Sequence, residues 1–287
     1  MEESLKDIVV IYHGQCRDGF GSAYAAWKKF GDDASYIPFR DHTTAPDGLV
    51  DKEIYIVDFS FLLPILQKLN DTNKSVVVID HHVSAQADVE SFPQNIFDNN
   101  HSGAVLSWKY FHPDTAVPPM LQYIEDHDIW KFALPNNREY AAALGEYEVS
   151  FKSWDKLIKD LEDESFLEAF LKTGKIIAKT GDDMVEKLMQ YKERVLFEGH
   201  EVWALNVSRT FRSILGHNLA TLNEEAGGAA MGIVYYHANG TVNISLRSNG
   251  DFDVSKLATK HNGGGHKNAA SIKVKSFSDL PFTFIED

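Results

Sequence analysis

Residues 76–82 read Val-Val-Val-Ile-Asp-His-His, an apolar run that ends in one carboxylic acid and two imidazoles. A run of β-branched apolar residues predicts a buried strand of a parallel sheet. In an open parallel sheet, ligands bind just beyond the carboxyl ends of the strands. We therefore expect Asp80, His81 and His82 at a functional edge, where their oxygen and nitrogen atoms suit a divalent metal. The alternative is a surface turn with incidental histidines.

Strand and helix signals alternate before this run. The pattern predicts strands over residues 8–13, 34–38, 53–59 and 76–80, and helices over residues 21–30 and 61–69. Such alternation is typical of a parallel α/β sheet.

Helix signals dominate the middle of the chain, and strand signals return after it. A helical stretch is expected from about residue 165 to residue 196. Beyond it, Asn239-Gly240 between two β runs predicts a hairpin. The fold class is therefore α/β with two lobes. We predict a larger parallel-sheet domain over residues 1–150, a helical connector over 151–196 and a smaller α/β domain over 197–287.

Composition limits the partners of the chain. Its 287 residues are 44% apolar and 24% charged, and 42 acidic against 28 basic residues give a net charge of −14. This charge argues against broad electrostatic binding to duplex DNA or anionic lipid. No apolar run approaches the ~18 residues of a membrane span, and the first residues do not resemble a secretory signal. A single cysteine fits a reducing compartment, so we expect a cytoplasmic protein with no membrane partner.

Metal-type side chains follow several of the predicted elements. His13 ends the first predicted strand and Asp18 follows it, Asp58 lies at the end of the third, and Asp126 and Asp128 follow a helix predicted to begin near residue 119. Carboxylates crowded at one sheet edge would repel one another without a cation. The pattern therefore indicates a shared metal centre.

These motifs resemble, in order and spacing, the four motifs of the DHH phosphoesterases, a family that includes RecJ-like exonucleases and oligoribonucleases. The resembling residues are His13 with Asp18-Gly19, Asp58, Asp80-His81-His82 and Asp126-x-Asp128. Gly263-Gly264-Gly265-His266 resembles the signature of the DHH-associated C-terminal domain.

The resemblance implies roles for individual residues. Metal ligands would be His13, Asp18, Asp58, His81 and Asp126, with Asp58 bridging two ions. Asp80 would support His81 from behind, Asp128 would support the site, and His82 would face the substrate phosphate. The substrate would also contact Arg247, Gly264, Gly265, His266 and Lys267.

Cys16 departs from the family pattern, which usually has an aspartate at this place. A thiolate there would favour ions softer than magnesium. The alternative is that Cys16 is a small buried residue without a ligand role.

The expected activity is a phosphodiesterase that acts on short single-stranded oligonucleotides or small nucleotides. Two divalent ions about 3.5–4 Å apart would activate a water molecule for attack on phosphorus. Mn²⁺ is the expected cofactor, with Mg²⁺ or another transition metal as alternatives. Two other functions stay open, a hydrolase of polyphosphate or pyrophosphate and a nucleotide-binding sensor with a decayed metal site. Oligomerisation is also left open.

Two aromatic residues follow the last motif. We expect Trp130 and Phe132 in the core, and stacking on a nucleobase is the alternative.

Overall fold

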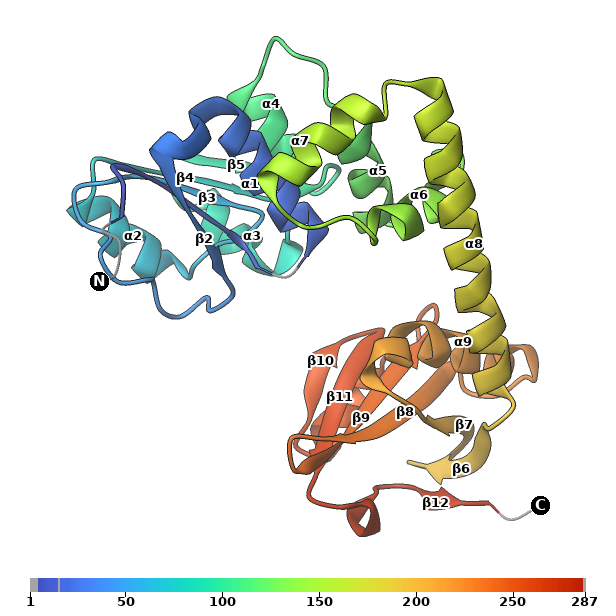
Figure 1. Ribbon diagram of the computed structural model, residues 1–287. Helices are drawn as coiled ribbons and strands as arrows, with labels where there is room; N and C mark the ends of the chain where they lie inside the picture. Colours follow the sequence, from blue (N-terminus) through green and yellow to red (C-terminus); the bar gives the residue numbers. More distant parts are fainter. Residues whose placement is uncertain (1–4, 15, 286–287) are drawn as a thin grey trace. The chain divides into compact units, whose positions relative to one another are not determined.

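The computed structural model describes residues 5–14 and 16–285, so the first four residues of the chain lie outside the description (Figure 1). Its Cα positions divide into two compact units, residues 1–178 and residues 179–287. None of the described helices is long and apolar enough to cross a bilayer.

The first unit is built on a five-stranded sheet in which every pairing is parallel. Its strand order is β2-β1-β3-β4-β5. The strands are β1 (Ile8–His13), β2 (Ala34–Phe39), β3 (Glu53–Val57), β4 (Ser75–Asp80) and β5 (Asn95–Phe97). This sheet confirms the predicted α/β class. The chain moves from β1 to β2 on one side and then crosses to β3 on the other, and ligands of open α/β sheets bind at such a reversal.

Both faces of this sheet are buried, which explains why its strands are apolar runs without alternation. Val10 packs into a core on one face with residues of α1, α4, α5 and α7. Val9 and Ile11 point to a second core, with residues of α2 and α3. The helices are α1 (Arg17–Phe30), α2 (Leu63–Thr72), α3 (Gln86–Glu90), α4 (Gly103–Phe111), α5 (Pro119–Asp128), α6 (Asn137–Leu144) and α7 (Phe151–Asp160).

The second unit holds a seven-stranded sheet in the order β10-β11-β9-β8-β7-β6-β12, flanked by α9 (Arg212–Glu225) and α10 (Val254–Lys260). Only the β7–β8 pairing is parallel among the described strands. The strands are β6 (Glu193–Phe197), β7 (His200–Asn206), β8 (Met231–Ala238), β9 (Thr241–Ser248), β10 (Gly264–His266), β11 (Ala269–Val274) and β12 (Thr283–Phe284). Asn239 and Gly240 form the predicted two-residue hairpin, and both have positive φ angles, as a type I′ turn requires.

The expected helical stretch ends earlier than predicted. Helix α8 (Glu164–Met189) stops before residues 193–197, which form strand β6 instead. Val195 and Phe197 of β6 are fully buried and alternate with exposed neighbours, which is the period of a strand.

Candidate metal centre

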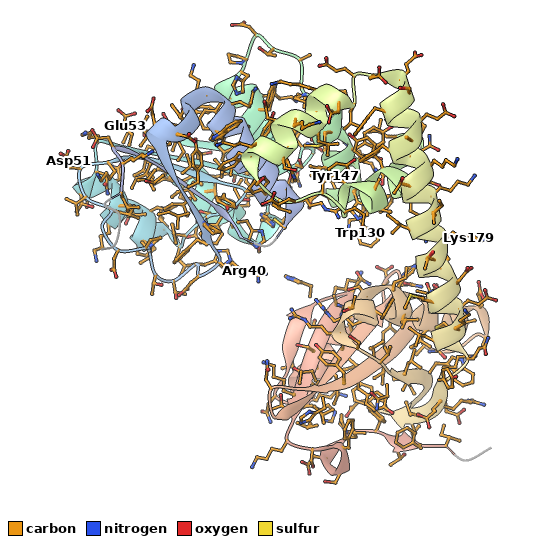
Figure 2. The ribbon with its side chains drawn as sticks, viewed as in Figure 1. Arg40, Asp51, Glu53, Trp130, Tyr147 and Lys179 are labelled. Carbon is orange, nitrogen blue, oxygen red and sulfur yellow. The ribbon has the colours of Figure 1, made fainter. Side chains whose placement is uncertain are left out.

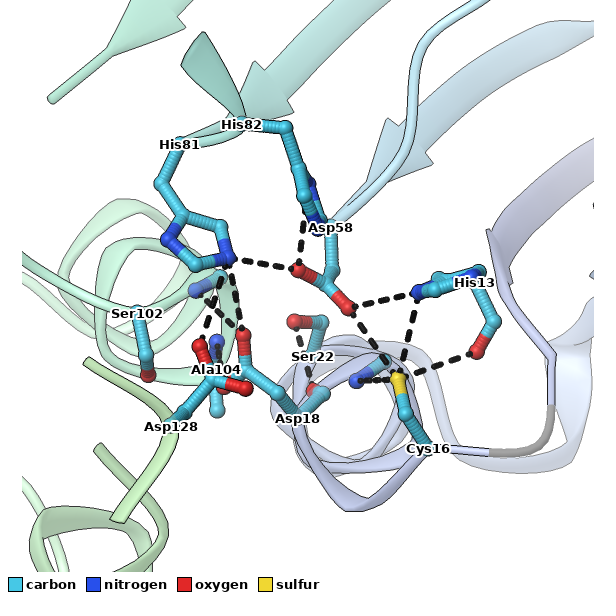
Figure 3. Close-up of polar contacts among 12 residues, drawn as sticks. His13, Cys16, Asp18, Ser22, Asp58, His81, His82, Ser102, Ala104 and Asp128 are labelled. Atoms are coloured by element: carbon cyan, nitrogen blue, oxygen red, sulfur yellow. Dashed lines mark hydrogen bonds and ion pairs between the residues drawn. The ribbon is translucent and has the colours of Figure 1, made fainter. Parts of the chain in front are cut away.

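Three neighbouring strands bring the predicted ligands together at one edge of the first sheet. His13 ends β1, Asp58 follows β3, and Asp80 ends β4 just before His81 and His82. Because β1, β3 and β4 are adjacent and parallel, their carboxyl ends meet at the same edge. Figure 3 shows the resulting cluster.

One group of donor atoms surrounds Oδ2 of Asp58. The Cys16 thiol donates to this oxygen at 3.4 Å, and Nδ1 of His13 lies 3.6 Å from it. Sγ of Cys16 is also 3.3 Å from Nδ1 of His13. The three donor atoms lie within 4.8 Å of one another, a spacing at which a metal ion could contact all three.

A second set of donors lies on the other side of Asp58, around Nε2 of His81. This nitrogen is 3.1 Å from Oδ1 of Asp58 and 3.5 Å from one oxygen each of Asp18 and Asp128 (Figure 3). Nδ1 of His82 is 3.9 Å from the same Asp58 oxygen. Asp58 therefore presents one oxygen to each set, as a residue bridging two ions would.

Asp58 itself is held in an unusual conformation. Its φ angle is +53°, and the side chain is 1% exposed. Nε2 of His81 is the charged neighbour of Oδ1 at 3.1 Å, but within the described residues no group donates a well-aligned hydrogen bond to this oxygen. A Cβ atom on Gly103 would lie 2.5 Å from Cβ of Asp58, so only glycine fits there. A buried carboxylate oxygen without a hydrogen-bond donor is costly unless a cation neutralises it, which makes the site a good fit for divalent metal.

The crowding of carboxylates shows in their proton affinities. Burial, together with the charges of Asp58 and Asp128, raises the pKa of Asp18 well above its usual value. Burial and Asp58 also raise the pKa of Asp128. Burial would raise the pKa of Asp58, but the nearby His13 and His81 imidazoles hold it below its usual range. Burial and Asp58 raise the pKa of the Cys16 thiol. A bound divalent cation would favour the ionised form of all these groups.

Asp18 is oriented by helix α4. Its two oxygens accept the N–H groups of Gly103 at 2.7 Å and Ala104 at 3.0 Å, and the side chain is 2% exposed. These N–H groups belong to the first turn of α4 and have no partner within the helix. The helix end therefore fixes the position of the carboxylate.

Asp80 supports the neighbouring turn in a way that the sequence did not predict. Its Oδ1 accepts the backbone N–H of His81 at 2.8 Å and lies 2.7 Å from Nδ1 of His82. The contact with Asp80 raises the pKa of His82 to about 9. Asp80 thus orients the ring of His82 and only the backbone of His81.

The structure places Asp126 outside this cluster. Its oxygens accept the N–H groups of Ala133 at 2.8 Å and Leu134 at 3.0 Å, and the side-chain amide of Asn137 at 2.7 Å. Residues two positions apart on a helix lie on nearly opposite faces. Because Asp128 lies on the face of α5 that meets His81, Asp126 points away from the cluster. Asp128, expected only as support, is the residue at the cluster.

A cationic groove of 660 Å³ lies on the second unit. It is lined by Arg247, Gly264 and Gly265, which were expected to bind substrate, and by three further cations that were not: Arg209, Arg212 and Lys273. None of the described residues that line it is acidic, although the chain carries a net charge of −14.

Two residues of the expected substrate set lie apart from this groove. His266 and Lys267 are not among its lining residues, and Lys267 pairs instead with Asp251 at 2.6 Å. Arg247 is held in the groove by the hydroxyl of Ser245 at 2.8 Å and its own strand's Leu246 carbonyl at 2.9 Å.

Comparison with known proteins identifies a domain in the second unit. Residues 202–282 match the model of the DHHA1 domain. The chain is 28% identical over 301 residues to the uncharacterized protein R106 of Acanthamoeba polyphaga mimivirus, with 97% of this chain and 70% of that protein covered.

The second unit of this chain therefore carries a DHHA1 domain. The chain is 24% identical to a 3′,5′-cyclic-nucleotide phosphodiesterase of Helicobacter pylori, over 74% of this chain and 71% of that protein. Its fold is similar to that of the pGpG-specific phosphodiesterase PggH of Vibrio cholerae, with a TM-score of 0.56, 13% identity, and 96% of this chain and 95% of that chain covered. The DHHA1 domain begins in β7 and includes all the described residues that line the cationic groove.

The two aromatic residues that follow Asp128 are not in the core of the first unit. Trp130 is 77% exposed and Phe132 is 48% exposed, contrary to the expectation from sequence. Both residues lie beyond the end of α5 and have positive φ angles, so they belong to a loop rather than to a packed helix face.

Proposed function

We propose that this chain is a DHH-family phosphoesterase, specifically a divalent-metal-dependent phosphodiesterase acting on short oligonucleotides or small nucleotides. The observation that carries the proposal is the position of Asp58, with Oδ2 facing His13 and Cys16 and Oδ1 facing His81. A buried carboxylate between two sets of donors suits a pair of cations better than a single one.

Each ion would have its own ligands. We assign His13, Cys16 and Asp58 to one ion, and Asp18, Asp58, His81 and Asp128 to the other. Two bound ions would supply positive charge for the phosphoryl oxygens and lower the pKa of a coordinated water. Asp126 has no place in this assignment, because its oxygens already accept three hydrogen bonds.

His82 is proposed to contact the substrate phosphate. Its side chain is 41% exposed, and Asp80 fixes the ring through Nδ1. Nε2 is then left to donate a hydrogen bond to a phosphoryl oxygen, a charge-assisted contact when the ring is protonated.

The cationic groove of the DHHA1 domain is proposed to bind a phosphate group of a substrate. Arginine suits this role because its planar guanidinium binds phosphate through two hydrogen bonds. Gly265 has a φ angle of +147°, and a Cβ atom there would lie 2.4 Å from the Ala269 carbonyl oxygen. Only glycine therefore fits at this position of the groove lining. Similarity to proteins named for cyclic nucleotides and for pGpG supports a nucleotide as substrate.

The test begins with protein stripped by EDTA and reloaded with Mn²⁺ or Mg²⁺. A panel of 5′-phosphorylated RNAs of two to five nucleotides, a 3′,5′-cyclic nucleotide, pyrophosphate and polyphosphate would be offered. We expect turnover of the nucleotides only with metal, and its loss in Asp58→Asn and His81→Ala. Asp155→Asn, a substitution away from the cluster, is the matched control and should retain activity.

Two results would replace this proposal. Faster turnover of pyrophosphate or polyphosphate would make the protein a phosphoanhydride hydrolase that uses the same groove. Tight nucleotide binding without turnover under any metal would make it a sensor.

A further inference from the structure

An exposed aromatic pair lies in the loop between α5 and α6. Trp130 is 77% exposed and Phe132 is 48% exposed, and their rings meet edge to face with centroids 5.5 Å apart. Figure 2 shows Trp130 projecting from this loop. Tryptophan is seldom so exposed in a folded protein, and two adjacent exposed rings call for a functional explanation.

The loop is built to hold these rings outward. Trp130 and Phe132 have φ angles of +57° and +47°, a region that residues with a Cβ atom rarely adopt. The backbone carbonyl of Asp126 accepts the N–H groups of Lys131 at 3.0 Å and Phe132 at 3.1 Å. The buried Asp126 carboxylate, described above, fixes the two residues that follow Phe132. Strain retained by such a network is typical of functional sites.

The pair lies close to the metal centre. Trp130 is two residues from Asp128, whose Oδ2 is 3.5 Å from Nε2 of His81. Cα atoms two residues apart are separated by at most about 8 Å, so the Cα atom of Trp130 lies within that distance of the Cα atom of Asp128. Phe132 also contacts the ring of His127, with centroids 5.4 Å apart. The rings therefore belong to the border of the site.

We propose that Trp130, supported edge-on by Phe132, is the platform on which a nucleobase of the substrate stacks while its phosphate lies at the metal centre. The inference rests on the proposed phosphodiesterase function and deepens it. Stacking on an aromatic face accepts every base, because each base has a π-face. The platform would therefore select substrates that carry a base without selecting a sequence.

The first experiment measures binding without turnover. In EDTA, titration with a 5′-phosphorylated RNA dinucleotide should quench the tryptophan fluorescence of the wild-type protein, and Trp130→Phe should remove most of that quenching. A matched titration with a 5′-phosphorylated abasic dinucleotide should quench little. Equal quenching in Trp130→Phe and wild type would overturn the proposal.

The second experiment separates stacking from general damage. In Trp130→Ala with Mn²⁺, the kcat/KM for the dinucleotide relative to that for its abasic counterpart should fall about tenfold, mainly through KM. Trp130→Tyr should restore most of this ratio. Tyr191→Ala removes another aromatic side chain that is 73% exposed, and it should leave the ratio as in wild type.

The outcomes are distinguishable. If the ratio of kcat/KM values is unchanged in Trp130→Ala, the stacking proposal is overturned. This includes the outcome in which Trp130→Ala only converts a dimer to a monomer, which would show that the rings contact a second copy of the chain. If the wild-type protein hydrolyses neither compound, the phosphodiesterase function fails, whereas the fluorescence titration still decides whether Trp130 stacks on a base.

Discussion

Oδ2 of Asp128 lies 3.5 Å from Nε2 of His81, although the two residues come from a helix end and a strand end far apart in the chain. This contact makes Asp128 part of the candidate metal centre. Asp126, two residues earlier, supports the loop that follows α5 instead.

The two aspartates should therefore respond differently to the same substitution. Asp128→Asn is expected to weaken Mn²⁺ binding at least about tenfold. Its free energy of unfolding in urea should stay within about 0.5 kcal/mol of wild type or increase, because one of several crowded negative charges is removed. Asp126→Asn should lower the free energy of unfolding by about 1–3 kcal/mol, because an amide cannot accept all three of the hydrogen bonds that the carboxylate accepts. Isothermal titration with Mn²⁺ and urea melts of both variants measure the two quantities. The reverse pattern would return the ligand role to Asp126.

Cys16 offers a spectroscopic test of its proposed ligand role. Co²⁺ bound to the wild-type protein should show an intense near-ultraviolet charge-transfer band from sulfur, because the thiol lies 3.3 Å from Nδ1 of His13 among the other donors. Cys16→Asp should lose this band, keep Co²⁺ binding and shift the metal preference towards harder ions. A wild-type spectrum without the band, at full occupancy of both sites, would make Cys16 only the N-cap of α1, where it accepts the Gly19 N–H at 3.1 Å.

Gly103→Ala tests how tightly the backbone of α4 packs on Asp58. The new methyl group would lie 2.6 Å from Oδ1 of Asp58, so either the carboxylate or the helix must move. We expect destabilisation by about 1–3 kcal/mol and a loss of Mn²⁺ affinity. Gly181→Ala on α8 is the control, because a Cβ atom there would meet no described atom within 4 Å apart from its chain neighbours and the backbone of its own helix. That variant should gain about 0.4–1 kcal/mol, and normal metal binding in Gly103→Ala would contradict the packing argument.

Asp155 should contribute stability that depends on pH. Partial burial would raise its pKa, but hydrogen bonds from Lys159, Lys28 and Tyr24 outweigh this and lower the pKa to about 2. A lowered pKa in the folded state stabilises the protein above the unfolded value of 3.8, and this stability is lost as the pH falls from about 4 towards 2.

Asp155→Asn should therefore destabilise the protein at pH 7 by about 1 kcal/mol after allowance for solvent screening, with the difference shrinking as the pH falls to about 2. Thermal melts across this pH range measure it. Asp160→Asn, which removes a carboxylate paired with Lys156 on the same helix, is the control and should cost less than about 0.5 kcal/mol. A deficit in Asp155→Asn that stays constant with pH would exclude ionisation as its cause.

Much of the first unit was predictable because its signals are local. Val76 to Ile79 are β-branched and apolar, so burial on both faces follows from the residues themselves. The Asn239-Gly240 turn is likewise local, because two positive φ angles demand such residues. By contrast, α1 begins at Arg17, before the predicted start, because the side chain of Cys16 caps it.

The sequence by itself determined the α/β class, the parallel sheet and the strand ends at which His13, Asp58, His81 and His82 collect, because strand period and chain direction are read from neighbouring residues. Only the tertiary structure decided that Asp128 rather than Asp126 meets His81, that Arg209 and Arg212 join Arg247, and that Trp130 faces solvent. Those outcomes depend on helix phase, on sheet register and on left-handed loop conformations stabilised by distant hydrogen-bond partners, and a linear pattern does not carry that information.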